Sequence, residues 1–181
     1  MKNTQVTLVP LTPDDREQFI LDNQWAFKYG ALMEFGERDN HTDDNGEIIS
    51  RDTIEHCIDE SGNEAYRIML DDKIVGGVIL KIDSETHHNH LEILFVLPNE
   101  HSKGIGYSAW QAVEALHPET KVWETCTPYF EKRNIHFYVT KCGFHIVEFF
   151  NEFNADPNAP VEDSQVNEGP DEMFRFIKVM K

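Results

Sequence analysis

The feature that most constrains the fold is the stretch at residues 91–116, LEILFVLPNEHSKGIGYSAWQAVEAL. Residues 91–97 are apolar except for one carboxylate, Glu92. A short apolar run of this kind is typical of a strand that is buried on both faces of a sheet. Pro98 ends the run, because proline has no N–H to continue a sheet ladder. We therefore expect residues 91–97 to form a central strand.

A glycine-bearing turn and a helix follow this strand. Residues 105–116 predict the helix, because apolar residues recur there on one helical face: Ile105, Ala109, Ala112, Val113 and Leu116. The unpaired N–H groups at a helix start suit an anion such as phosphate, and Gly104 and Gly106 would let a ligand approach the backbone. A plain tight turn is the alternative, because this pair of glycines is a weak signal by itself.

The wider spacing around this turn carries a family resemblance. The pattern V-x-P-x5-G-x-G, from Val96 to Gly106, resembles the acyl-coenzyme A signature of the GCN5-related N-acetyltransferase (GNAT) superfamily. Residues 134–144, NIHFYVTKCGF, are similar to that family's second motif, in which Phe-Tyr is followed by Gly-Phe after a short spacer. In element order the resemblance covers residues 4–150. It implies an acyl-CoA-dependent N-acetyltransferase.

Size and charge limit the possible partners. The chain has 181 residues, 33 acidic and 16 basic, and a formal charge of −17, which fits one domain over residues 1–181. This balance argues against nucleic acid and against anionic membranes. It fits a cationic substrate, although many proteins are acidic simply for solubility. Three scattered cysteines, and the lack of an apolar targeting or membrane-length segment, favour a reducing cytoplasm.

The remaining pattern predicts an α+β domain. Further strands are expected at residues 5–10, 64–70, 73–82, 121–127, 144–150 and 173–180, and further helices at 13–33, 51–58 and 129–141. Thr12 and Ser50 are candidate N-caps, residues 71–72 a hairpin turn, and Gly76-Gly77 a bulge or a close backbone contact. Residues 154–171 predict a long, mobile loop. As the resemblance implies, these elements form a GNAT-like fold, with one mixed sheet of six or seven strands and about four helices.

The resemblance also implies a site for acetyl-CoA, the acyl donor, where the central strand and the next one separate. Main-chain groups of Phe95 and Val96 would pair with the pantetheine arm, and an N–H there would polarise the thioester carbonyl. Lys103 would add a mobile positive charge. The pyrophosphate would lie on the amides of His101, Ser102, Lys103, Gly104, Ile105, Gly106 and Tyr107.

The chain departs from the family pattern at three positions. His101 and Ser102 replace residues of the phosphate-binding turn, which puts the phosphate affinity in doubt. Glu131 stands where the family often has an asparagine. Asn134 would then take over that contact, or the contact is absent.

Acyl transfer to an amine needs a base for the ammonium and a proton donor for the leaving thiolate. Glu92 is the candidate base, because desolvation in an apolar strand raises the pKa of a carboxylate. The alternative is a partly exposed acid at a strand end. By the resemblance Tyr138 is the general acid, since a phenol with a pKa of about 10 is protonated at neutral pH. The alternative is a core aromatic. Cys142 is expected to pack at a helix end, so no acyl-cysteine intermediate is expected.

His87, His88 and His90 cluster in a polar link expected at residues 83–90, which raises the question of a metal. No cysteine or paired carboxylate is spaced with them along the chain, so no metal is expected.

The expected function is direct transfer of an acetyl group from acetyl-CoA to a primary amine of a small molecule or peptide, in a ternary complex. A homodimer is one option, as in many members of the family. Two alternatives stay open. One is a non-catalytic CoA-binding sensor. The other is an interaction protein that docks through its acidic residues 154–171.

Overall fold

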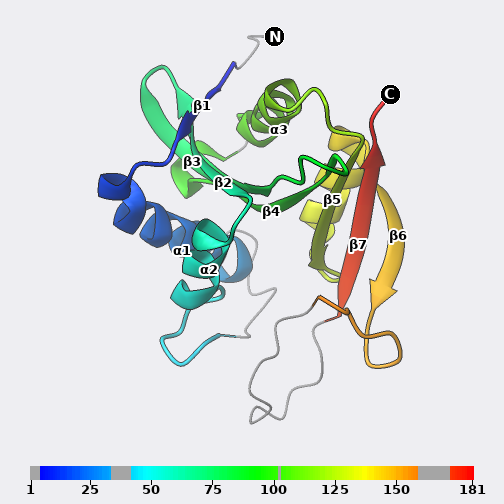
Figure 1. Ribbon diagram of the computed structural model, residues 1–181. Coiled ribbons are helices and arrows are strands. Elements are labelled where there is room, and N and C mark those ends of the chain that lie inside the picture. Colours follow the sequence, from blue (N-terminus) through cyan, green and yellow to red (C-terminus); the bar gives the residue numbers. More distant parts are fainter. Residues whose placement is uncertain (1–4, 34–41, 102, 159–171) are drawn as a thin grey trace.

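The computed structural model describes residues 5–33, 42–101, 103–158 and 172–181. Its centre is one seven-stranded sheet with the order β1-β2-β3-β4-β5-β7-β6 (Figure 1). Neighbouring strands are antiparallel except β4 and β5, which are parallel. This confirms the predicted mixed sheet. The strands are β1 (Thr7–Pro10), β2 (Asn63–Leu70), β3 (Lys73–Lys81), β4 (His88–Val96), β5 (Val122–Pro128), β6 (His145–Phe150) and β7 (Met173–Val179).

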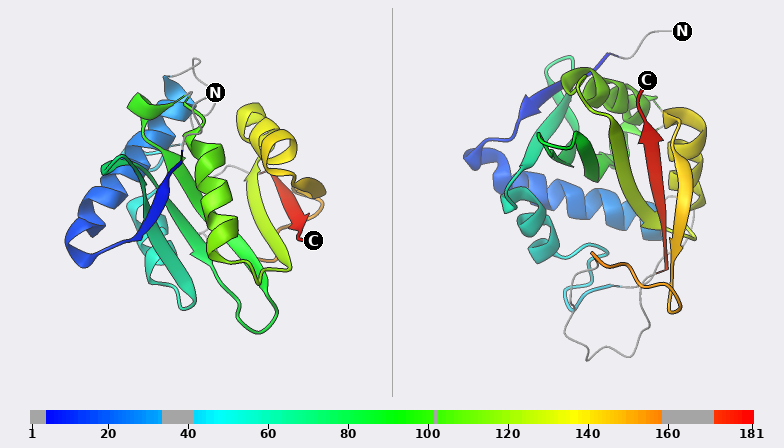
Figure 2. Two further views of the ribbon diagram at one scale, coloured as in Figure 1. Left: turned by 90° about the horizontal axis from the view of Figure 1, so that it is seen from above. Right: turned by 45° about the vertical axis from the view of Figure 1, so that its right-hand side comes forward.

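The helices cover both faces of the sheet. In the described residues they are α1 (Arg16–Leu32), α2 (Arg51–Asp59), α3 (Ile105–Leu116) and α4 (Lys132–His136), which continues as a π-helical segment (Phe137–Cys142). α1 and α2 lie on one face, and α3 and α4 on the other (Figure 2). No helix in this part of the chain is long and apolar enough to cross a membrane.

Both faces of β4 are buried by these layers. On one face Ile93 and Phe95 pack with Phe19 of α1. On the other face Leu91 packs with Trp110 of α3. A strand covered on both sides has apolar residues in both directions, which explains the nearly continuous apolar run in its sequence.

Several local predictions are confirmed. The Ser50 hydroxyl accepts the N–H of Thr53 at 3.1 Å and caps α2. Asp71 and Asp72 have φ angles of 49° and 61°, as a tight hairpin turn between β2 and β3 requires. Gly143, with φ of 79°, ends the π-helical segment in the left-handed region.

Two local predictions are wrong. The Thr12 side chain makes no cap. Instead the chain enters α1 through a 3-10 turn in which the Thr12 carbonyl accepts the N–H of Asp15 at 3.1 Å. The polar link before β4 is also shorter than expected, because β4 begins at His88. The buried Asn89 explains this start, since its side chain donates to Thr120 Oγ1 at 2.8 Å and accepts the Asp83 N–H at 2.9 Å.

Gly76 and Gly77 bring β3 against β4, as predicted. A Cβ on Gly76 would lie 2.2 Å from the carbonyl oxygen of Phe95, and one on Gly77 would lie 2.6 Å from the Phe95 ring. A register shift between Ile68 and Met69 falls beside them in the ladder between β2 and β3. The two glycines therefore let β3 lie close to β4 and determine the position of β4 on the edge that pairs with β3. Most of the loop predicted at residues 154–171 lies outside the described residues.

Candidate active site

The two parallel central strands separate partway along their length. β4 and β5 pair from His88↔Val122 to His90↔Glu124, and their ladder ends there. β4 continues to Val96 and β5 to Pro128, and Figure 1 shows the two strands diverging. We call this point of separation the fork. Beyond it, backbone groups on the facing edges are left without a ladder partner and can bind a ligand.

The ladder between β3 and β4 determines which groups of β4 face the fork. The N–H of Leu97 donates to the carbonyl of Val75 at 2.9 Å. Hydrogen-bonded and non-hydrogen-bonded pairs alternate in an antiparallel ladder, so Phe95, opposite Gly77, also turns its main chain toward β3. The intervening Leu94 and Val96 turn theirs toward the fork. Of the two residues predicted to meet pantetheine, Val96 is therefore the one on the fork side.

The turn after β4 and the start of α3 lie beside the end of β4. Gly104, with φ of 74°, precedes α3 in a left-handed conformation. Gly106 faces the fork: a Cβ there would lie 3.5 Å from the Phe137 ring and 3.9 Å from Val96 Cγ2. Ile105 is buried in the core and Tyr107 is exposed. The first turn of α3 thus lies beside the end of β4.

Side chains of the turn between β4 and α3 form hydrogen bonds with other protein groups. His101 Nε2 lies 2.9 Å from the carbonyl oxygen of Val96. Lys103 Nζ donates to Glu100 at 2.7 Å, and this hydrogen bond, with a second from Lys73, holds the pKa of Glu100 below its usual range. The positive charge predicted for Lys103 is therefore directed at Glu100. Ser102 lies outside the described residues.

Glu92 occupies a bulge at the fork. Ile79 pairs with Ile93 and Leu80 pairs with Leu91, so Glu92 is one extra residue in β4. Bulges often re-aim side chains beside active sites. The Glu92 side chain reaches solvent, yet the surrounding protein removes enough of its hydration to raise its pKa. The nearby charges of Glu60 and Glu124 raise this pKa further, against the opposing effect of Lys81.

Tyr138 lies on the opposite face of the sheet. It is buried in the core, with its ring centroid 5.6 Å from those of Phe144 and Phe176. Burial raises the pKa of its phenol, and a hydrogen bond with Thr125 opposes that rise. The Thr125 hydroxyl in turn donates to the carbonyl of Leu91 at 2.9 Å. Through Thr125, Tyr138 reaches the backbone next to Glu92.

Two threonines of β5 were not singled out from the sequence. Thr125 bridges the fork, and Thr127 Oγ1 accepts a hydrogen bond from Asn134 Nδ2 at 3.2 Å, which ties α4 to β5. Both threonines are buried, whereas Cys126 between them is exposed. The alternation of residues along β5 is the sequence signal that places both threonines on one face.

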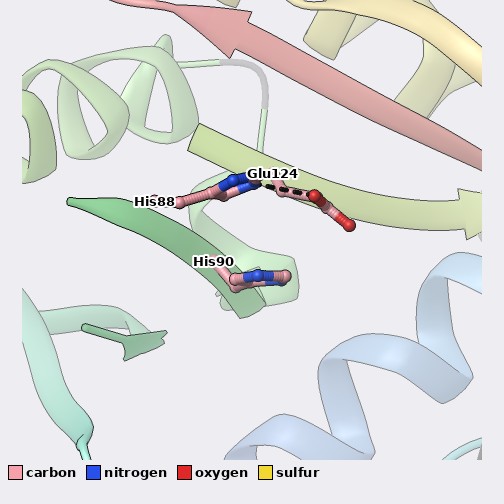
Figure 3. Close-up of side chains that lie close together, drawn as sticks. All are labelled: His88, His90 and Glu124. Carbon is pink, nitrogen blue, oxygen red and sulfur yellow. Dashed lines mark hydrogen bonds and ion pairs between the residues drawn. The ribbon is translucent and has the colours of Figure 1, made fainter. Parts of the chain in front are cut away.

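A polar group lies just before the fork (Figure 3). His88 and His90 of β4 lie beside Glu124 of β5, and His88 Nε2 is 2.9 Å from Glu124 Oε2. Arg175 of β7 donates to both oxygens of Glu124, at 2.8 and 3.2 Å. Burial raises the pKa of Glu124, but Arg175, His90 and His88 together outweigh it, so the pKa is lowered. Burial lowers the pKa of His90. The sequence showed no carboxylate spaced with these histidines, and the sheet register supplies one from the next strand.

A surface hollow of about 290 Å³ lies elsewhere, lined by residues of the link after β1, of α1, of α2 and of β2. None of the predicted site residues lines it.

Comparisons with known proteins agree with this geometry. Residues 23–144 match the model of the acetyltransferase (GNAT) family. An uncharacterised protein of Bacillus subtilis, YrkN, is 42% identical over 184 residues, which cover 99% of this chain and 97% of YrkN.

Solved structures share the fold at low sequence identity. An acetyltransferase of Thermus thermophilus has a TM-score of 0.66 at 15% identity, covering 99% of this chain and 100% of that one. A spermidine N-acetyltransferase of Vibrio cholerae, in complex with CoA and spermine, has a TM-score of 0.65 at 16% identity, covering 98% and 96%. A GNAT acetyltransferase of Elizabethkingia anophelis with acetyl-CoA bound has a TM-score of 0.63 at 16% identity, covering 99% and 100%.

Proposed function

Because the chain belongs to the GNAT acetyltransferase family, we propose that it transfers an acetyl group from acetyl-CoA to a primary amine of a small molecule or peptide. The observation that carries this proposal is the fork. There β4 has an unladdered edge beside the first turn of α3, and Glu92 lies in a bulge on that strand. Tyr138, on the opposite face, connects to β4 through Thr125. The neighbours with bound acetyl-CoA or CoA support the choice of donor.

We assign the cofactor to the side of the sheet that α3 and α4 cover. The pantetheine arm would pair with main-chain groups of Val96 and Leu94, and one N–H of this edge would polarise the thioester carbonyl. The pyrophosphate would bind the amides at the start of α3, with Asn134 at the far side. His101 would give up the Val96 carbonyl when the arm binds, since both use the same edge.

We propose direct transfer in a ternary complex. Glu92 takes a proton from the ammonium, and the neutral nitrogen attacks the thioester carbon. A C–N bond forms and the C–S bond breaks, and Tyr138 protonates the departing thiolate. The second proton that the nitrogen loses on becoming an amide restores the Tyr138 phenol. Glu92 then returns its proton to solvent. Cys142 takes no part, because burial raises the pKa of its thiol to about 12 and leaves almost no thiolate at neutral pH. The transfer as proposed uses no metal.

The acceptor side lies on the face that α1 and α2 cover. The charges of Glu60 and Glu124 act on Glu92 there. Among the described lysines and arginines, Lys81 pairs with Glu60 and Arg175 with Glu124, and the three carboxylates are thus only partly compensated. This excess of carboxylates favours a cationic acceptor. The spermidine N-acetyltransferase fold neighbour supports the same class.

The test of the function is release of free thiol from acetyl-CoA, followed with a panel of amines. Spermidine and spermine should be turned over faster than a primary amine with no second cationic group, and faster than a peptide with a carboxylate beside its N-terminus. If acetyl-CoA binds saturably but no amine releases thiol, the enzyme proposal fails and a non-catalytic CoA-binding module replaces it.

Replacement of Tyr138 by phenylalanine should lower kcat about tenfold and leave acetyl-CoA binding unchanged. General acids usually contribute more. The effect is smaller here because a thiol has a pKa near 8.5, so the thiolate can leave without complete protonation. Steady-state kinetics and thermal unfolding of both proteins measure the change. An unchanged kcat in a folded Tyr138→Phe protein would make Tyr138 a core aromatic only.

A further inference from the structure

The polar group before the fork combines two imidazoles and one carboxylate. His88 and His90 project from the same face of β4, because they are two residues apart in a strand. Glu124 lies opposite His90 in the parallel ladder with β5. One possible ligand atom from each of the three side chains lies within 4.8 Å of the other two (Figure 3).

We propose that His88, His90 and Glu124 bind a divalent transition-metal ion of the zinc class. The ion itself takes no part in the transfer chemistry, although Glu124 is also one of the carboxylates of the proposed acceptor side. The proposal stands whether or not the chain acetylates amines.

The donor set suits such an ion. Imidazole nitrogen and carboxylate oxygen are Zn²⁺ ligands at about 2.0–2.2 Å, and a tetrahedral ion then holds its ligand atoms about 3.4 Å apart. The observed spacing is close enough that rotation of side chains alone, without movement of the strands, would complete the site. Three protein ligands leave one position for water, and the 38% exposure of the His88 side chain gives a path to solvent.

The surroundings hold the ligands in place. Asn89, between the two histidines, is fully buried and is anchored by hydrogen bonds to Asp83 and Thr120. Arg175 donates to both oxygens of Glu124, from Nε to Oε1 at 2.8 Å and from Nη2 to Oε2 at 3.2 Å, and so holds the carboxylate with Oε2 beside His88 Nε2. Partners of this kind commonly orient metal-binding carboxylates. The ion would replace the proton shared between His88 Nε2 and Glu124 Oε2, and that proton would pass to Nδ1 or to solvent.

The ordinary alternative is an ion pair without metal. It accounts for His88, which hydrogen-bonds Glu124, but not for His90. The half-buried His90 ring is stacked on His88, with centroids 5.4 Å apart and planes 19° apart, and makes no hydrogen bond to any described residue. Two parallel imidazoles with their nitrogens near one carboxylate are the arrangement that a shared cation explains.

The test is a Zn²⁺ titration of chelator-treated, tag-free protein by calorimetry, repeated with Co²⁺ by visible absorption. We expect one saturable site per chain and Co²⁺ bands typical of four-coordinate binding. His90→Gln and His88→Gln should each weaken binding at least tenfold. His136→Gln, the same change at an exposed histidine of α4, should leave the affinity unchanged.

Thermal unfolding of each variant shows that it is folded. The proposal is overturned if no saturable site exists in the parent protein. It is also overturned if folded His88→Gln and His90→Gln proteins bind Zn²⁺ as tightly as the parent, because the ion then binds elsewhere. Neither outcome depends on acetyl transfer.

Discussion

Replacing Gly106 with glutamate should weaken acetyl-CoA binding at least about a hundredfold, or by about 2.7 kcal/mol. Gly106 faces Val96 and Phe137, so a longer side chain there projects into the proposed path of the cofactor. Its carboxylate would also repel the pyrophosphate at the start of α3. Calorimetry measures the affinity directly. Thermal unfolding should lose the stabilisation of about 2.7 kcal/mol that a ligand confers at a hundredfold excess over its Kd.

The matched control is Gln111→Glu, which adds the same charge at an exposed position further along α3. It should bind acetyl-CoA like the parent protein. Tight binding by a folded Gly106→Glu protein would place the cofactor somewhere other than the fork. No binding by the parent at millimolar concentration would show that His101, Ser102 and Glu131 mark a degenerate site.

Replacing Glu92 with glutamine should lower kcat by about 10²- to 10⁴-fold, the usual contribution of a general base. Acetyl-CoA affinity should be unchanged, because Glu92 lies on the proposed acceptor side of the sheet and not on the proposed cofactor side. The pH profile identifies the role. Glu92 acts when ionised and its pKa is raised, so kcat of the parent should fall as the pH drops through a value above the ordinary 4.5.

In Glu92→Gln the fall that is due to protonation of Glu92 should disappear. The remaining pH dependence is that of the amine itself. Residual turnover then depends on the small fraction of deprotonated amine, which rises about tenfold per pH unit below the pKa of the amine, near 10.4 for a lysine-like group. Glu85→Gln, at an exposed position in the link before β4, is the matched control and should keep the parent profile. If Glu92→Gln keeps both kcat and its acidic limb, another group is the base.

The parts of the fold that the sequence predicts are those determined by neighbouring residues. The apolar run that ends at Pro98 predicts β4, and the recurrence of apolar residues on one helical face predicts α3. The hairpin at Asp71-Asp72 and the end of the helix at Gly143 follow from residues that adopt positive φ. The order of these elements matches the family motifs, so the fork and the position of α3 were predictable as well.

The parts that depend on pairing between distant strands were not predictable. The bulge at Glu92 exists only relative to β3, and Glu124 meets His90 only through the register of β5. Thr125 reaches Leu91 across the fork because the two strands diverge there. No spacing within the chain encodes these contacts. The candidate residues were therefore predictable from the sequence, but the polar network that surrounds them was not.

The glycines of β3 have a consequence for substrate choice. Gly76 touches the backbone of β4 on the edge away from the fork, so a methyl group there has no room unless β4 moves; at Gly77 a methyl group would instead displace the rings of Phe19 and Phe95. The movement of β4 is directed toward β5 and narrows the place where the acyl chain would lie. Under the proposed function, we expect selectivity among acetyl, propionyl and longer thioesters to depend partly on residues that no ligand touches. Substitutions at these two positions should therefore change the preference for acyl-chain length without changing any residue that contacts the thioester.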